Sequence, residues 1–219
     1  MTSFRPMLAA RAALGALVIL GACGRDVVAP RAPVAPPTTS FSRDGRQPDF
    51  LEPAPGAPTI ANPTIAFWAV KGRDVRVKMV YHQRPGGGGN DSVVFAELRV
   101  RARSLALRPD GSPITNGDSV FITMTLVDPT RGILDFQPSG LRFSRKDPPS
   151  LKISFEHANL DLNGDGRVDD LDRVIERTFH IAVRESPADP WVPLRSAVNT
   201  HDFEIEATIQ GFSGYAIDY

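Results

Sequence analysis

Apolar and polar residues alternate along most of the chain after residue 64. Val75, Val77 and Met79 share one face, while Arg76 and Lys78 share the other. The same pattern recurs at 96–103, 120–126, 151–156 and 203–209. A period of two residues is typical of strands with one buried face. Clusters rich in Gly, Pro, Asn and Asp separate these segments at 85–90, 109–118 and 147–150. The pattern predicts an all-β, antiparallel, two-sheet sandwich over residues 64–219.

The first 22 residues have a different pattern. They contain Arg5 and Arg11 but no acidic residue, and an apolar run covers 12–20. Such a run is too short to cross a bilayer, so it predicts an export signal peptide. The following Leu-Gly-Ala-Cys at 20–23 resembles the lipobox of bacterial lipoproteins. That resemblance implies that Cys23 is lipidated and that the chain is an exported, membrane-anchored lipoprotein; an ordinary secretory signal is the alternative.

Gly24 follows the cysteine. By analogy with lipoprotein sorting, this residue favours the outer membrane or cell surface over the inner membrane. Residues 23–63 then form a linker that holds nine of the twenty prolines. A segment of this composition cannot bury a core, so we expect a disordered, extended spacer between the lipid and the sandwich.

A twelve-residue stretch, 161–172, interrupts the strand pattern. Oxygen-bearing side chains stand at its positions 1, 3, 5, 9 and 12, and Gly166 stands at position 6, where a sharp turn is needed. A hard cation such as Ca²⁺ takes six to eight oxygen ligands, whereas Mg²⁺ demands tighter octahedral geometry and is the lesser candidate. The predicted ligands are Asp161, Asn163, Asp165, the carbonyl of Arg167, Asp169 and Asp172.

This stretch resembles the calcium loops of dockerins and of bacterial EF-hand-like proteins. The resemblance implies that Val168 packs inward, and the helical spacing of the apolar residues that follow predicts a short helix over 170–178. Dockerins carry two such loops at a chain end. A single loop between strand-like segments argues against cohesin binding and favours a structural ion within an insertion, 158–178, of a hairpin. The alternative is a polar loop that only turns the chain.

Three short motifs follow one another in the second half of the chain: FQPSGLRF at 136–143, WVPL at 191–194 and GFSGYAI at 211–217. In this order they resemble the ZU-type β-sandwich of ankyrins and netrin receptors, and its relatives in bacterial lipoproteins, over residues 93–219. The resemblance implies a domain for adhesion or protein contacts, without catalysis. Some relatives cut their own chain between Phe and Ser after a His, but Gly211 stands in that position, so no self-cleavage is expected.

Charge and composition narrow the function further. The 25 basic and 25 acidic residues leave no basic excess for nucleic-acid binding. The single cysteine excludes a disulfide framework or a thiolate zinc site within the chain. The four histidines are scattered and match no catalytic motif, so we do not expect an enzyme.

Three hypotheses follow from the sequence. The first is a lipid-anchored envelope protein whose calcium-ordered sandwich mediates protein contacts or adhesion at the cell surface. The second is a polysaccharide-binding module, which would need an exposed aromatic platform; the candidates are Trp68, Trp191, Tyr81 and Tyr215. The third is a hydrolase assembled from carboxylates that are distant in the sequence.

Overall fold

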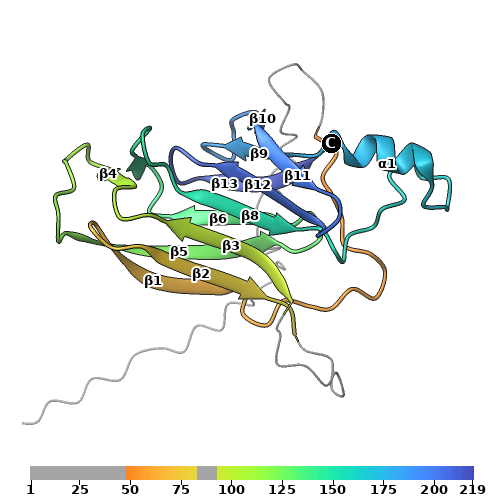
Figure 1. Ribbon diagram of the computed structural model, residues 1–219, viewed down its shortest axis with the longest axis horizontal. Coiled ribbons are helices and arrows are strands. Elements are labelled where there is room, and N and C mark those ends of the chain that lie inside the picture. Colours follow the sequence, from red (N-terminus) through yellow and green to blue (C-terminus); the bar gives the residue numbers. More distant parts are fainter. Residues whose placement is uncertain (1–47, 83–92) are drawn as a thin grey trace, which may run out of the picture. The chain divides into compact units, whose positions relative to one another are not determined.

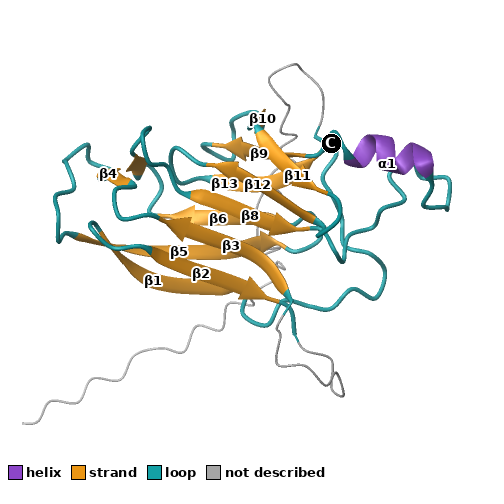
Figure 2. Cartoon of the chain, in the orientation of Figure 1, coloured by secondary structure: helices purple, strands orange, loops and turns teal. Residues whose placement is uncertain are grey.

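The computed structural model describes residues 48–82 and 93–219. The signal peptide, Cys23, most of the predicted linker and the glycine-rich segment at 85–90 lie outside these residues. Strands are the predominant regular structure of the described residues, with one helix, α1 (Asp170–Glu176), at the end of the domain (Figure 2).

Two antiparallel sheets form the domain (Figure 1). The six-stranded sheet consists, in spatial order, of β1 (Thr64–Val70), β5 (Ser119–Asp128), β6 (Ile133–Gln137), β13 (Gly214–Asp218), β9 (His180–Arg184) and β10 (Val192–Pro193). The five-stranded sheet consists of β11 (Ser196–Asn199), β12 (Glu204–Thr208), β8 (Ser150–Ser154), β3 (Val94–Val100) and β2 (Val75–Val80). A small ribbon pairs β4 (Leu105–Leu107) with β7 (Arg142–Phe143). The prediction of an all-β sandwich is confirmed.

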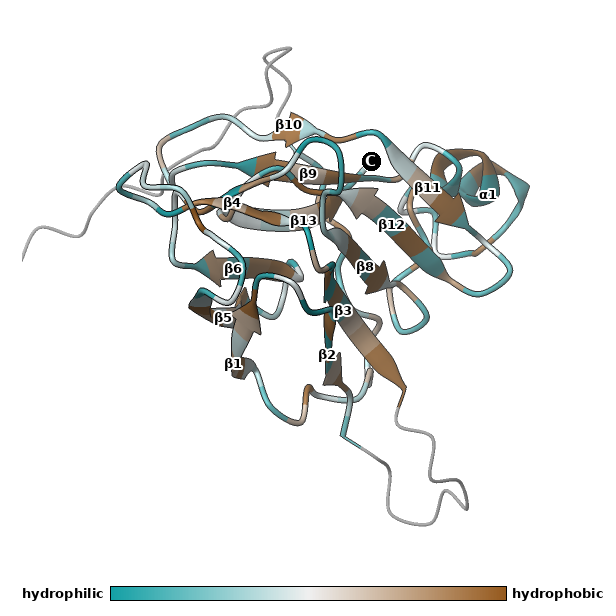
Figure 3. Ribbon diagram, turned by 60° about the vertical axis from the view of Figure 1, so that its left-hand side comes forward, coloured by the Kyte–Doolittle hydropathy of each residue, from teal (hydrophilic) through white to brown (hydrophobic). Residues whose placement is uncertain are grey.

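The core lies between the two sheets and follows the alternation of the sequence. Along β5, Val120, Ile122 and Met124 are buried, and Phe121 between them is exposed. One continuous cluster joins Ile122 of the six-stranded sheet to Leu151 of the five-stranded sheet. Figure 3 shows the same alternation of polar and apolar residues along β12. Burial of the apolar face of each sheet is therefore the main stabilising contribution.

Residues 48–63, which the sequence assigns to the linker, lie against the sandwich. Leu51 is buried in the core, and its N–H donates to the carbonyl of Ile217 at 3.1 Å. The carbonyl of Glu52 accepts from the N–H of Asn159 at 2.8 Å. The apolar residues among these prolines give the segment a face to bury, which the proline count alone does not reveal. The described domain thus begins well before residue 64.

The predicted calcium loop lies in the connection between β8 and β9. These strands belong to different sheets, so the insertion does not interrupt a hairpin, as the sequence analysis expects, but crosses from one sheet to the other. Alternation identifies a strand and its buried face without telling which sheet the strand joins. The helix of this connection is present as predicted, and in the described residues no helix is long and apolar enough to cross a membrane.

Candidate metal centre

Short-range hydrogen bonds fold the first half of the loop, residues 161–167. Oδ2 of Asp161 accepts from the N–H of Gly166 at 2.9 Å. Oδ1 of Asn163 accepts from the N–H of Asp165, and Oδ1 of Asp165 accepts from the N–H of Arg167, each at 2.9 Å. Gly166 has a φ of 85°, a left-handed conformation that glycine adopts without strain. Three predicted ligands are thus gathered within one tight turn.

Asp161 carries the least satisfied oxygen of this turn. Its Oδ1 is buried and has no hydrogen-bond partner among the described residues. A buried carboxylate oxygen without a partner is unfavourable, because it has lost its hydration without receiving a hydrogen bond in exchange. A cation at this oxygen would remove that cost.

Asp172 occupies a different environment from the one expected for a terminal ligand. Its side chain is almost fully buried, and its Oδ1 accepts from the N–H groups of Leu162 and Asn163 at 2.8 and 3.1 Å. Its Oδ2 accepts from the N–H of Asp169 at 2.8 Å. The hydrogen bond from Asp169 is the largest influence that lowers the pKa of Asp172, against the opposing effect of burial. Asp172 therefore ties the start of the loop to the start of α1.

Asp169 is the N-cap residue of α1. Its Oδ1 accepts from the N–H of Leu171 at 2.8 Å, and Asp172 completes a capping box. The backbone N–H of Arg167, the predicted carbonyl ligand, donates to Asp165, and its side chain is exposed. The six predicted ligands thus divide into an oxygen-rich turn at residues 161–167 and a helix cap at residues 169–172.

Glu176 is a further carboxylate at this end of the domain, and the sequence analysis did not single it out. It lies four residues after Asp172, on the same face of α1, and both residues are buried. Its Oε1 has no hydrogen-bond partner among the described residues, and burial raises its pKa. In the sequence, its position four residues after Asp172 could have identified Glu176 as a neighbour of Asp172 on one face of the helix.

Helix α1 and the residue before it expose several apolar side chains. Val168, Leu171 and Val174 are 60, 63 and 59% exposed, whereas Asp172 and Glu176 are buried. The prediction that Val168 packs inward is therefore wrong. The capping hydrogen bonds of Asp172 hold Asp172 and Glu176 toward the domain, so that Leu171 and Val174 are left to solvent while Ile175 is half-buried.

The donor chemistry of the turn fits a hard cation in part. Every candidate ligand offers oxygen, and Oδ1 of Asp161 lacks a partner. In contrast, both oxygens of Asp172 already accept backbone hydrogen bonds. Within residues 48–82 and 93–219, no three His, Cys, Asp or Glu side chains form a metal-binding group. The residues that fit the ion best are Asp161, Asn163, Asp165 and the carbonyl of Arg167.

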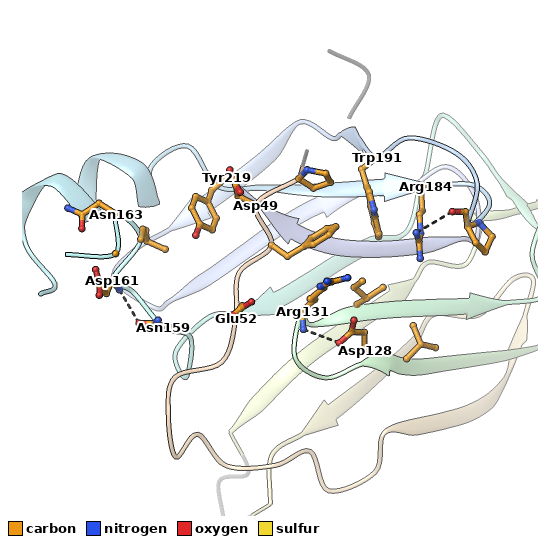
Figure 4. Close-up of a pocket in the computed structure, with 17 residues that line it drawn as sticks. Asp49, Glu52, Asp128, Arg131, Asn159, Asp161, Asn163, Arg184, Trp191 and Tyr219 are labelled. Atoms are coloured by element: carbon orange, nitrogen blue, oxygen red, sulfur yellow. Dashed lines mark hydrogen bonds between the residues drawn. The ribbon is translucent and has the colours of Figure 1, made fainter. Parts of the chain in front are cut away.

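A groove of about 920 Å³ begins beside this turn (Figure 4). Asp161 and Asn163 line one end, and Arg131, Arg184 and Trp191 line the other. The guanidinium carbon of Arg184 lies 4.7 Å from the centroid of the Trp191 ring, a cation–π arrangement. Burial lowers the pKa of Arg184 below its ordinary value. The groove therefore has an oxygen-rich end and a cationic end.

The motifs that carry the ZU-type resemblance lie in the core. Phe212 stacks on Phe136 with ring centroids 5.2 Å apart, and it contacts Phe143 edge-on at 4.9 Å. The hydroxyl of Tyr215 donates to the carbonyl of Gly211, and Ser213 is buried. The first and third motifs thus pack on each other, and the Phe–Ser bond is enclosed in the domain.

Of the four aromatic residues considered for a polysaccharide platform, Trp191 and Tyr215 are buried and Tyr81 is half-buried. Only Trp68 is exposed, and the sequence analysis missed its exposed neighbour Phe121.

The chain matches no protein-family profile, no curated protein and no solved structure.

Proposed function

We propose that this chain is an envelope lipoprotein, anchored through Cys23, whose Asp161–Asp172 loop binds a structural calcium ion and presents α1 for contact with another envelope protein. The observation that carries the proposal is the outward apolar face of α1, attached directly to the oxygen-rich turn. Large apolar side chains exposed together on a soluble domain are typical of interaction sites.

Calcium has a specific task in this proposal. Bound at Asp161, Asn163, Asp165 and the carbonyl of Arg167, the ion would neutralise the carboxylates of the turn and supply a partner for Oδ1 of Asp161. The turn leads into α1 through the Asp169 cap. Ordering the turn therefore fixes the direction in which Leu171 and Val174 point.

The test is a calcium titration of the full-length chain in detergent after chelator treatment, followed by calorimetry and thermal unfolding. We expect one calcium per chain and a rise in melting temperature. At 100 times the dissociation constant, a single site adds about 2.7 kcal/mol to the free energy of unfolding. The double variant Asp161→Ala/Asp165→Ala should lose both the binding heat and the rise. A parallel titration with magnesium should give weaker binding.

Asp110→Ala is the matched control, because Asp110 also caps an exposed turn, through hydrogen bonds from the N–H and hydroxyl of Ser112. This variant should keep the calcium response. Identical melting of wild type and double variant across the titration would show that residues 161–172 form only a turn.

Polysaccharide binding is the second candidate function. The exposure of Trp68 beside Phe121 favours it, and this surface is independent of the calcium loop.

A further inference from the structure

An aromatic pair lies on the outer face of the six-stranded sheet. Trp68 of β1 and Phe121 of β5 are direct cross-strand partners and are 62 and 49% exposed. Their ring centroids are 5.1 Å apart, with an interplanar angle of 55°. A cross-strand aromatic contact stabilises a sheet. That role does not require the outward faces of both rings to be open to solvent.

Polar residues continue this face across the sheet. One cross-strand row runs from Thr64 through Thr125, Asp135 and Gly214 to Arg184. With neighbouring strands about 4.8 Å apart, the row is about 19 Å long. Beside it, Gln137 pairs with Thr123, and its Nε2 donates to Oδ2 of Asp135 at 2.8 Å. The aromatic pair thus adjoins a broad field of hydroxyl, amide, carboxylate and guanidinium groups.

Gly214 lies beneath the Arg184 side chain. A Cβ atom at this position would lie 3.4 Å from Cγ of Arg184 and 3.7 Å from the ring of Trp191. The Arg184 side chain therefore lies close over the glycine backbone, with Trp191 beneath its guanidinium. The far end of the face is consequently a positioned donor group at the mouth of the groove of Figure 4.

The chemistry of this face suits a sugar chain better than a protein or a membrane. A pyranose ring has an apolar C–H face and a hydroxyl edge, which match an aromatic pair beside planar hydrogen-bonding side chains. A stable protein interface has a more apolar centre than a single pair of rings. An anionic membrane surface attracts clusters of Lys and Arg, whereas on this face the acidic Asp135 stands near the basic Arg184.

We infer that the outer face of the six-stranded sheet, from Trp68 and Phe121 to Arg184, binds a glycan chain. The chain outside the structure supports this occupant. The residues between Cys23 and Pro48 reach at most about 90 Å when fully extended, so a lipid anchor confines this face to the envelope layer, where polysaccharide is abundant. The argument from the lipid anchor rests on the proposed function. The argument from the chemistry of the face is independent of it.

The experiment is isothermal calorimetry of the full-length chain in a detergent without a sugar headgroup. The probes are a β-1,4-linked N-acetylglucosamine hexamer and cellohexaose, each with calcium and with chelator. We expect binding of at least one glycan under both conditions. Trp68→Ala and Phe121→Ala should each weaken it about tenfold or more. Trp68→Tyr keeps a stacking ring and should retain most of the affinity.

Val93→Ala is the matched control, because it trims an exposed apolar side chain next to β3, on the other sheet, and it should bind as wild type does. Absence of heat with both glycans would overturn the inference, as would equal affinity in wild type and the two alanine variants. Conversion of a dimer to a monomer by Trp68→Ala, without glycan binding, would assign the face to self-association instead. Binding that persists with chelator keeps this result separate from any failure of the calcium or lipid-anchor proposals.

Discussion

Asp172 and Glu176 are two buried carboxylates one helical turn apart, and the structure treats them in opposite ways. Three backbone N–H groups converge on Asp172, and their hydrogen bonds lower its pKa. Glu176 has lost its hydration, and burial raises its pKa. Ionisation of the first group therefore favours the folded state, and ionisation of the second opposes it.

These opposite shifts give a prediction for the pH dependence of stability. The contribution of Asp172 is present above its unfolded-state pKa and is lost as the pH falls through its lower folded-state pKa. The penalty of Glu176 is present above its raised folded-state pKa and disappears as the pH falls below its unfolded-state pKa. In chelator at pH 7, Asp172→Asn should lower the melting temperature and Glu176→Gln should raise it. Both differences should shrink on acidification, that of Glu176→Gln at the higher pH.

Thermal unfolding between pH 7 and pH 3 measures both effects, with the exposed Glu185→Gln as the control. A lower melting temperature for Glu176→Gln at pH 7 would contradict the argument, because it would mean that the ionised carboxylate is stabilised in the fold.

At this scale the sequence predicts residue types better than residue roles. The spacing of oxygens in residues 161–172 indicates a loop built from carboxylates, and the structure confirms that Asp161, Asn163 and Asp165 fold one turn together. The role of Asp172 as a helix cap could not be predicted with the same certainty, because capping and metal binding both require an oxygen at that position.

Helix α1 is the element in which local pattern and tertiary position disagree. Its apolar residues recur at helical spacing, which predicts the helix correctly, but the buried face is the acidic one. Spacing identifies a face without determining what the face contacts. The strands differ because both sheets bury their apolar faces against the same core, so the periodicity predicts their burial as well as their existence.

Substitutions of exposed and of buried residues in the connection between β8 and β9 should therefore have unequal effects on stability. Leu171→Ser with Val174→Ser should change the free energy of unfolding by less than about 0.5 kcal/mol for each residue, because both side chains are already exposed. Phe179→Ala should lower it by about 3–5 kcal/mol, because Phe179 is buried in the core against Phe155. Chemical denaturation measures both.

The double variant Leu171→Ser/Val174→Ser, called the serine pair, can also be tested for association with a partner. If α1 is a protein-contact surface, the pair should abolish association with an envelope partner while the fold remains intact. A large loss of stability in the serine pair would place the apolar face of α1 against the domain instead.

For the whole molecule, the described residues form a single sandwich that begins before residue 64. Residues 48–63 join the domain because Leu51 is buried and their backbone pairs with the sandwich. The crossing of the 158–178 connection between sheets could not be predicted, because strand pairing is set by contacts far apart in the sequence. The two-sheet architecture could be predicted, because alternation and turn residues recur along the whole domain.

A substitution at Cys23 tests the proposed lipid anchor. Cys23→Ser should move the protein from the membrane fraction to the soluble exported fraction and abolish incorporation of a labelled fatty acid. In the proposed function the thiol is the acylation site, and a lipid chain contributes about 0.8 kcal/mol for each buried methylene. Fractionation and fatty-acid labelling measure the two effects. Retention of the variant in the membrane with the label still incorporated would contradict the lipoprotein assignment.

The pairing of residues 49–51, where the described domain begins, has a mechanical consequence. Asp49 and Leu51 form backbone hydrogen bonds with Tyr219 and Ile217, and Phe50 bridges to Asp218. The strand that receives these bonds, β13, lies inside its sheet between β6 and β9 rather than at an edge. A force applied to the chain before Asp49 would therefore be passed first to an interior strand with hydrogen-bonded neighbours on both sides, rather than to a strand at the rim of the sheet.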